Sequence, residues 1–384
     1  MSVPPRVYLD HASAMPAHPA ALAAADHVAR AFPGDPARQH AEGHAARDVL
    51  ESARAAVGRT VGVAAERLLF TAGGTESVHL AVRGAAAANR TRPSRIVSSA
   101  VEHSAVLAAA DATDHEHVRV GVDALGRLDL DALAEALRPG AALVSLQHAN
   151  HETGTLQPLA AAAALCREAD ALLHVDACQT VGRLPVDAEA LGADFLSLSA
   201  AKFGGGRGVG ALGWSARARF RAQLTGDERE GRRRAGLEHL PGIAAMAETL
   251  LHLRPDDPAG PAAAEAARCD RLRRRLREQL RALDDVEVHG PDDGSLPHIV
   301  AISALYVDGQ ALVGELDRAG FAVHSGSSCA STSGQPSHVL VAMGALTHGH
   351  VRASLGPQVD SDAADAFAVA LGRAVTGLRA RVGR

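Results

Sequence analysis

The sequence predicts an α/β protein with a mostly parallel sheet, and two observations carry this prediction. Short apolar runs rich in Val, Leu and Ile alternate with stretches of helical periodicity from about residue 20 to residue 242. A cluster of chain breakers at residues 255–261 then precedes a long charged helix, residues 262–283, and a strand-rich tail. Such alternation is typical of a parallel sheet with helices on both faces. We therefore expect a large N-terminal domain and a smaller C-terminal domain.

The expected strands of the sheet are short and apolar. They are residues 68–70, 95–98, 118–121, 142–146, 172–175 and 195–199. The expected helices between them include residues 74–88, 129–137 and 158–169.

Composition limits the possible partners. Hydrophobic residues make up 47% of the chain and charged residues 22%, as in soluble globular proteins. The net charge of −5 gives no electrostatic reason to expect nucleic acid or an anionic membrane as a partner. We read the arginine runs 232–234 and 273–275 as solvated faces.

Neither a membrane span nor a secretory signal is expected, because no apolar stretch is long enough for either. The four cysteines lack the spacing of a metal site, so no metal is expected, and a reduced, cytoplasmic protein is the simplest interpretation.

Lys202 is the only lysine among 384 residues. A guanidinium replaces an amine as a surface charge, but it cannot form an imine with an aldehyde. Enzymes that use pyridoxal phosphate require such an amine. Lys202 follows the apolar run 194–199 and precedes three glycines, so it should lie at the C-terminal end of a buried strand, where chemistry is expected. This position favours a catalytic amine over a leftover surface lysine.

Other candidates precede Lys202 at strand ends. Gly74 and Thr75 open a helix whose N-terminus could hold a phosphate, although a plain helix cap would also explain them. Asp176 could keep a pyridine nitrogen protonated or could simply cap a helix. His103 could stack on a ring and move protons or could be structural.

The chain closely resembles the cysteine desulfurases of the class V aminotransferase group. The resemblance rests on motifs in the family's order along almost the whole chain. They are residues 8–12, 70–77, 101–107, 148–155, 174–179, 199–204, 325–331 and 352–356. It implies pyridoxal phosphate fold type I, with a large cofactor-binding domain at residues 16–256 and a small α+β domain formed by residues 1–15 and 257–384.

The resemblance also implies roles for individual residues. Lys202 would be the Schiff-base residue, with His103 stacked on the ring. The ring would also contact His151, Asp176 and Gln179, and the phosphate would contact Gly74, Thr75 and Ser199. Arg352 would hold the substrate carboxylate through its bidentate fork.

Cys329 lies in a small, polar stretch, residues 325–336, unlike a buried structural cysteine. It resembles the family's catalytic cysteine, in the subgroup with the longer loop. The implied reaction converts L-cysteine into L-alanine and leaves a persulfide on Cys329 for a sulfur-acceptor or scaffold protein. A homodimer is also implied. Cys166, Cys178 and Cys269 are interpreted as structural.

Three positions depart from the family pattern. Ala201 replaces a histidine that binds the phosphate, Leu237 replaces a threonine supplied by the partner subunit, and His151 replaces an asparagine near the ring. Two lost charge-assisted bonds, at about 1.5–3 kcal/mol each, predict weaker cofactor binding, unless an arginine among residues 232–234 or His239 compensates. Another class V reaction, such as that of a lyase or aminotransferase, and a catalytically reduced sulfur-transfer partner remain alternatives. The sequence names neither the acceptor nor the pathway, and it is silent on selenocysteine.

Overall fold

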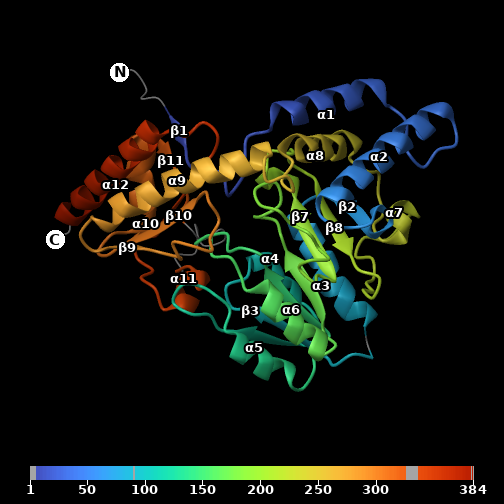
Figure 1. Cartoon of the computed structure of the whole chain (residues 1–384), viewed down its shortest axis with the longest axis horizontal. Coiled ribbons are helices and arrows are strands. Elements are labelled where there is room, and N and C mark those ends of the chain that lie inside the picture. The colour runs from blue at the N-terminus through green and yellow to red at the C-terminus, as the bar shows by residue number, and fades with distance from the viewer. Residues whose placement is uncertain (1–5, 90, 326–335, 382, 384) are drawn as a thin grey trace.

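The computed structural model of the chain describes residues 6–89, 91–325, 336–381 and 383. A seven-stranded sheet with the order β2-β8-β7-β6-β5-β3-β4 forms its larger part (Figure 1). Its strands are β2 (Leu68–Thr71), β3 (Arg95–Ser99), β4 (Glu116–Val120), β5 (Leu143–Gln147), β6 (Leu172–Asp176), β7 (Phe195–Ser199) and β8 (Gly210–Trp214). Only β8 runs antiparallel to its neighbours, so the predicted, mostly parallel sheet is confirmed.

Helices cover both faces of this sheet. They are α1 (Pro19–Ala31), α2 (Ala41–Thr60), α3 (Gly74–Ala88), α4 (Ser104–Asp111), α5 (Leu130–Leu137), α6 (Leu159–Glu168), α7 (Arg229–Arg232) and α8 (Leu240–Leu253), with short 3₁₀ turns η1 (Ala65–Arg67) and η2 (Ala200–Lys202). Apolar side chains of α3 and α4 share one buried cluster with the sheet, and those of α2, α5, α6 and α8 share another.

The two faces explain why the strands read as continuous apolar runs. Leu143 packs with the α3 and α4 side, whereas its neighbour Val144 packs with the opposite side, and both are fully buried. Successive side chains of a strand point to opposite faces, so a strand covered on both faces is apolar at most positions, and the polar residues there, such as Ser145 of β5 and His174 of β6, are hydrogen-bonded to each other.

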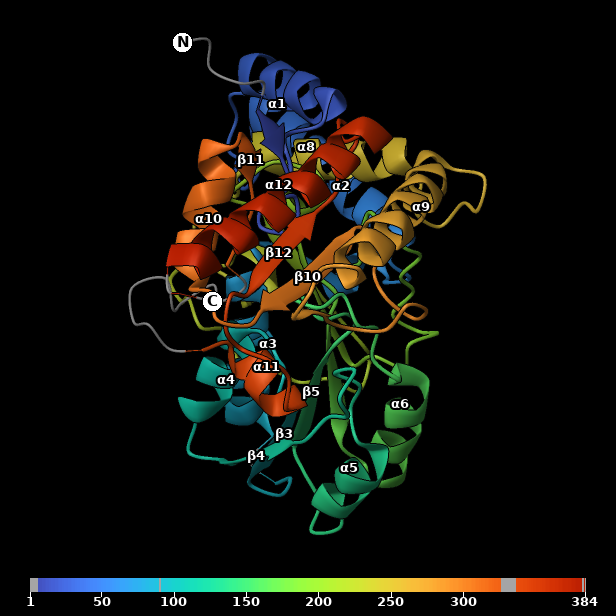
Figure 2. The same cartoon turned by 90° about the vertical axis from the view of Figure 1, so that its left-hand side faces the viewer.

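A smaller lobe is built around a three-stranded antiparallel sheet of order β12-β10-β9. Its strands are β9 (Val286–Val288), β10 (Ile299–Ala304) and β12 (Val351–Ser354), and β1 (Val7–Tyr8) pairs in parallel with β11 (Phe321–Ala322) nearby. Its helices are α9 (Pro261–Arg281), α10 (Gly309–Arg318) and α12 (Ser361–Arg381), which Figure 2 shows over the strands, whereas α11 (His338–Met343) packs against Val101 of the larger part.

This lobe has its own buried cluster, which joins Leu9 near the N-terminus to residues between 269 and 375. We keep the division into residues 16–256 and residues 1–15 with 257–384 as a proposal, which the separate cluster supports. Within the described part of the chain, no helix is both long and apolar enough to span a membrane.

Two expectations about the C-terminal part need correction. The tail is not dominated by strands, because α10, α11 and α12 occupy more of it than β9 to β12. In α12 the buried residues Phe367, Leu371 and Val375 recur every four positions, which is a helical period.

The run 273–275 is not a uniformly solvated face. The Arg273 side chain is 1% exposed, whereas that of Arg275 is 55% exposed. Arg273 donates to the Asp292 carbonyl at 2.6 Å and to Asp270 Oδ1 at 2.7 Å. An arginine in α9 can therefore be buried because acceptors from the following loop reach it, which charge patterning does not show.

Candidate active site

A cavity of about 160 Å³ opens between the two lobes, at the edge of the large sheet where its parallel strands end. The structure brings together all nine predicted site residues that it describes. They are Gly74, Thr75, His103, His151, Asp176, Gln179, Ser199, Lys202 and Arg352. The C-terminal ends of parallel strands meet at one edge of a sheet, so residues far apart in sequence converge there.

Lys202 ends η2, the single turn that follows β7. Its Nζ donates hydrogen bonds to the carbonyl oxygens of Ala12, at 2.9 Å, and Ser13, at 2.8 Å. Burial lowers the pKa of the Lys202 amine, and the nearby Arg352 guanidinium lowers it further. A lowered pKa makes the neutral, nucleophilic amine easier to form.

The N-terminus of α3 forms an anion cup. Its N-cap, Gly73, has φ 154° and offers no side-chain cap, so the backbone N–H groups of the first turn are left for a ligand. Gly74 must lack a side chain, because a Cβ there would lie 2.6 Å from the Cys178 sulfur. Thr75 and Ser199 line the cup from two elements. This geometry suits a phosphate better than a plain helix cap would.

One of the three arginines at 232–234 reaches this region. Arg234 Nε donates to Glu76 Oε1 at 3.0 Å, and Glu76 Oε2 accepts from Ala72 N at 2.7 Å. The hydrogen bond to Glu76 thus holds Arg234 beside the first turn of α3.

Asp176 and Gln179 line the same cavity. Asp176 is the last residue of β6, and its Oδ1 accepts from Cys178 N at 3.0 Å and Ser197 Oγ at 3.3 Å. Gln179 Nε2 donates to the Ala12 carbonyl at 3.0 Å, whereas its buried Oε1 has no partner among the described residues. The site therefore keeps an unused acceptor for a donor group.

Two histidines form an aromatic wall. The ring centroids of His103 and His151 lie 5.1 Å apart, with an edge-to-face angle of 67°. His103 Nδ1 accepts from Ala105 N at 3.1 Å, so a neutral His103 carries its proton on Nε2. Burial lowers the pKa of His103 and lowers that of His151 further, so both rings are neutral near pH 7.

Arg352 comes from β12 in the smaller lobe. Its Nη1 donates to the His151 carbonyl at 2.7 Å, and its Nη2 donates to Asp10 Oδ1 at 2.8 Å and Ser13 Oγ at 2.7 Å. Its buried Nε has no partner among the described residues. The guanidinium is thus rigidly held, with a donor left for a further acceptor.

The sequence did not assign roles to three groups at this site. Asp10 pairs with Arg352, and the carbonyls of Ala12 and Ser13 hold Lys202. The sequence could have pointed to Asp10 and Ala12, because residues 8–12 form one of the motifs that carry the family resemblance. Cys178, which we expected to be merely structural, also lines the cavity, but burial raises the pKa of its thiol well above the ordinary value. It is thereby kept protonated.

Cys329 lies outside the described residues, and so its place relative to Lys202 stays a prediction. The described residues on both sides of residues 326–335 approach the site. His324 lines the cavity, and Ser337 Oγ donates at 2.6 Å to Glu152 Oε2, one residue after His151.

Comparison with known proteins gives similarities over nearly the whole chain. The family profile "Aminotransferase class-V" matches residues 7–367. A cysteine desulfurase of Cereibacter sphaeroides is 39% identical over 360 residues, which cover 91% of this chain and 90% of the relative. The cysteine desulfurase IscS of Dictyoglomus turgidum is 36% identical over 359 residues, covering 91% and 89%.

Solved structures agree with the observed architecture. A NifS-like protein superposes with a TM-score of 0.88 at 27% identity, covering 97% of this chain and all of that one. A NifS-like protein from Rickettsia africae gives a TM-score of 0.86 at 26% identity, covering 97% and 99%.

Proposed function

Because this chain belongs to the aminotransferase class-V family, we propose that it is a cysteine desulfurase that converts L-cysteine into L-alanine. The observation that carries the proposal is the place of its single lysine, half-buried in the wall of a cavity that an anion cup and a rigid arginine also line. Relatives at 36% and 39% identity that bear this activity in their names support it.

The donor set fits pyridoxal 5′-phosphate. The cup at Gly74, Thr75 and Ser199 suits its phosphate, and the unpartnered Gln179 Oε1 and the carboxylate of Asp176 face the remainder of the cavity. When bound, this coenzyme supplies an aldehyde for an amine and a ring that accepts electron density from the substrate. Asp176 would hold a proton on the ring nitrogen, and His103 would lie against the ring.

Two side chains of the protein, Lys202 and His103, would transfer protons. Lys202 Nζ, whose pKa is lowered by burial, can accept a proton and return it. His103 Nε2 carries a proton at the same cavity and serves as the second donor. The carbonyls of Ala12 and Ser13 orient the Lys202 amine between transfers.

Arg352 would bind the substrate carboxylate, since it lines the cavity and keeps an unused Nε donor. We further propose that the thiolate of Cys329 attacks the substrate sulfur. The new S–S bond forms as the substrate's C–S bond breaks, and the released carbon takes up protons to become alanine. The sulfur remains as a persulfide for an acceptor protein.

We also propose that the protein is a cytoplasmic homodimer. Leu224 and Leu237 are 49% and 63% exposed, and the Ala235 N–H donates to the Leu224 carbonyl at 3.2 Å, which holds their two segments together. An exposed apolar pair of this kind is suited to a subunit interface. In the family a threonine at position 237 comes from the partner subunit, which supports an interface at the same segment.

Cofactor retention should be weaker than is usual for the family. Ala201 and Leu237 carry no donor for the phosphate, and Arg234 is already paired with Glu76. A titration that finds sub-micromolar retention of pyridoxal phosphate would contradict this part of the proposal.

The decisive experiment compares three proteins supplied with pyridoxal phosphate and L-cysteine: the natural sequence, Lys202→Ala and Cys329→Ser. We expect the natural sequence to form alanine and a protein-bound persulfide. Lys202→Ala should lose the visible absorbance band of the bound coenzyme and all activity. Cys329→Ser should keep the band and form no persulfide.

Two outcomes would reject the assignment. Alanine formation that survives Cys329→Ser would indicate another class V reaction. A natural protein that stays colourless with the coenzyme would indicate a catalytically reduced sulfur-transfer partner.

A further inference from the structure

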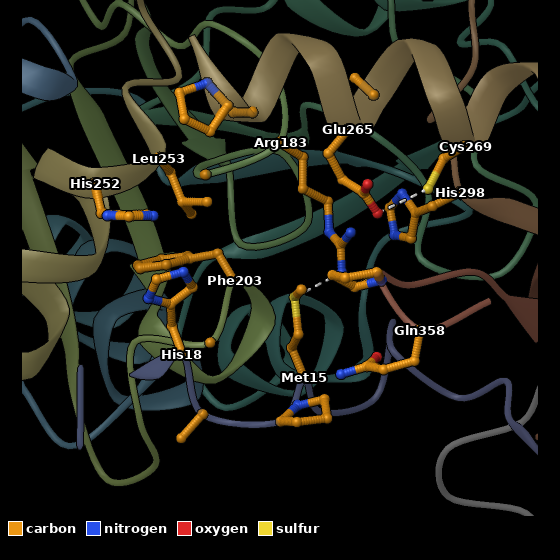
Figure 3. A pocket seen from close by; sticks show the side chains of 18 of the residues that line it. Met15, His18, Arg183, Phe203, His252, Leu253, Glu265, Cys269, His298 and Gln358 are labelled. Carbon is orange, nitrogen blue, oxygen red and sulfur yellow. Dashed lines mark hydrogen bonds between the residues drawn. The ribbon is translucent and has the colours of Figure 1, made fainter. Parts of the chain in front are cut away.

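Figure 3 shows a second cavity, of about 320 Å³, lined by residues of both lobes. It adjoins the Lys202 cavity. Neighbouring residues of the same two segments line the two cavities. Ala12 and Ser13 line the first, whereas residues 15–19 of the same segment line the second. Lys202 lines the first, whereas Phe203 and Gly204 line the second. None of the residues that line the second cavity has a role in the proposed reaction.

Arg183 brings a positive charge to this cavity without an ion pair among the described residues. It is 9% exposed, and only its Nη2 makes hydrogen bonds within the described part of the chain. The three acceptors are neutral and distant, namely the carbonyls of Lys202, at 3.2 Å, and His11, at 3.5 Å, and the Met15 sulfur, at 3.7 Å. Its buried Nε has no partner there. Burial lowers the pKa of Arg183 to about 10, so it stays charged at pH 7.

Glu265, the carboxylate that lines the cavity, only partly offsets this charge. Glu265 accepts two hydrogen bonds from Arg268, at 2.7 and 2.8 Å, and one from the Cys269 thiol, at 3.3 Å. Figure 3 shows the Glu265 carboxylate turned toward Cys269. One carboxylate therefore faces two guanidinium groups, and the cavity keeps a net positive charge.

His298 adds a second unsatisfied polar group. The ring is 0% exposed, and neither of its nitrogens has a hydrogen-bond partner within the described residues. Its pKa lies well below the ordinary value because of burial, so the ring is neutral and offers one N–H donor and one acceptor. Buried polar groups are nearly always partnered by protein, water or ligand, so both ring nitrogens can serve a molecule bound in the cavity.

The remaining wall is mostly apolar, although the side chains of His18, His252 and Gln358 also line it. It is formed by the Phe203 ring, Leu253, several alanines and five prolines, which are Pro16, Pro19, Pro261, Pro297 and Pro357. Small-molecule sites are typically concave, mostly apolar and equipped with a few convergent polar groups, and their volumes start near 300 Å³. The second cavity has these properties.

We propose that the second cavity is a binding site for a small monocarboxylate with a compact apolar body. The carboxylate meets Arg183 and the His298 ring, and the body packs against Phe203 and the prolines. A charge-assisted hydrogen bond to a guanidinium is roughly twice as strong as a neutral one, so an anion is favoured over an alcohol of the same shape.

The test is calorimetric titration of benzoate into the coenzyme-loaded protein, with benzyl alcohol as the uncharged analogue. We expect one site with a Kd on the order of 1 mM or tighter for benzoate, and at least about tenfold weaker binding of the alcohol. Ala266→Phe fills the cavity from α9 and should weaken benzoate binding at least about tenfold.

Matched controls separate this site from the Lys202 cavity. Ala267→Phe places the same ring on the exposed side of α9 and should leave the Kd unchanged. Arg183→Gln, checked for a cooperative thermal transition, is the second disabling variant and should also lose binding. The proposal is overturned if benzoate binds Ala266→Phe and Arg183→Gln as tightly as the natural sequence, if the alcohol binds equally well, or if no binding occurs at concentrations on the order of 10 mM.

Discussion

Glu152 is a carboxyl group buried between two neutral histidines, next to the cavity that holds Lys202. Its Oε2 accepts from Ser337 Oγ at 2.6 Å, and the Nε2 atoms of His151 and His350 lie 3.6 and 3.7 Å from its oxygens. Burial raises the pKa of Glu152 to about 7, although Ser337 and Arg352 act in the opposite direction. Glu152, which accepts a hydrogen bond from Ser337 shortly after residues 326–335, therefore changes its charge near neutral pH.

This raised pKa predicts how stability depends on pH. The folded state keeps the Glu152 proton that the unfolded state releases above about pH 4.5, so stability falls as the pH rises from there to about 7 and is level beyond it. Glu152→Gln keeps the acceptor for Ser337 and removes the ionisation. We expect it to be more stable than the natural sequence at pH 8, by at most about 3 kcal/mol, and similar at pH 4.5.

Thermal melting across this pH range checks the prediction. Glu135→Gln is the matched control, because that side chain is 64% exposed and should not alter the profile. Parallel curves for the natural sequence and Glu152→Gln would show that Glu152 does not titrate in this window.

At the scale of the element, the N-terminus of α3 depends on Gly74, the first residue of the helix, because it has no side chain. Gly74 lies against Cys178, in the loop that follows β6, and against Ser199, the last residue of β7. The close approach lets backbone N–H groups of α3, Asp176 and Lys202 border one small cavity. The anion cup is thus a property of three elements together.

Gly74→Ala should disrupt this contact. A Cβ 2.6 Å from the Cys178 sulfur would push the first turn of α3 away, and we expect coenzyme retention to fall by about tenfold or more. Retention is measured from the visible band during dialysis. Gly377→Ala in α12 is the control, since its Cβ meets nothing within 4 Å and should stabilise the fold by about 0.5–1 kcal/mol. Equal retention in both variants would refute the role of the cup.

At the scale of the whole molecule, the site exists only where the two lobes meet. Asp10 and Ser13 near the N-terminus hold Arg352, more than 330 positions later in the chain. The same N-terminal segment continues past Lys202 and forms a wall of the second cavity. Movement of one lobe against the other would therefore alter both cavities.

The proposed dimer is tested at this scale. Light scattering after size-exclusion chromatography should give twice the 39.5 kDa mass of one chain. Leu237→Asp places a charge on the exposed apolar pair and should shift the protein toward monomer, with loss of coenzyme. A natural protein that elutes as a monomer would contradict the proposed interface.

The sequence by itself determined the alternation of strands and helices, the single amine, and the order of the candidate residues along the chain. It could do so because side-chain periodicity is local, and because the C-terminal ends of parallel strands always meet at one edge. Lys202, Asp176 and His103 could all be placed at that edge in this way.

Only the tertiary structure decided which distant groups complete the site. The pairing of Asp10 with Arg352, the approach of Cys178 to Gly74 and the burial of Arg273 depend on how the lobes and loops pack. The unpaired charge of Arg183 could not be predicted either, because the sequence does not show whether water or a closed cavity surrounds an arginine. Burial is set by contacts across the whole chain, and no local pattern encodes them.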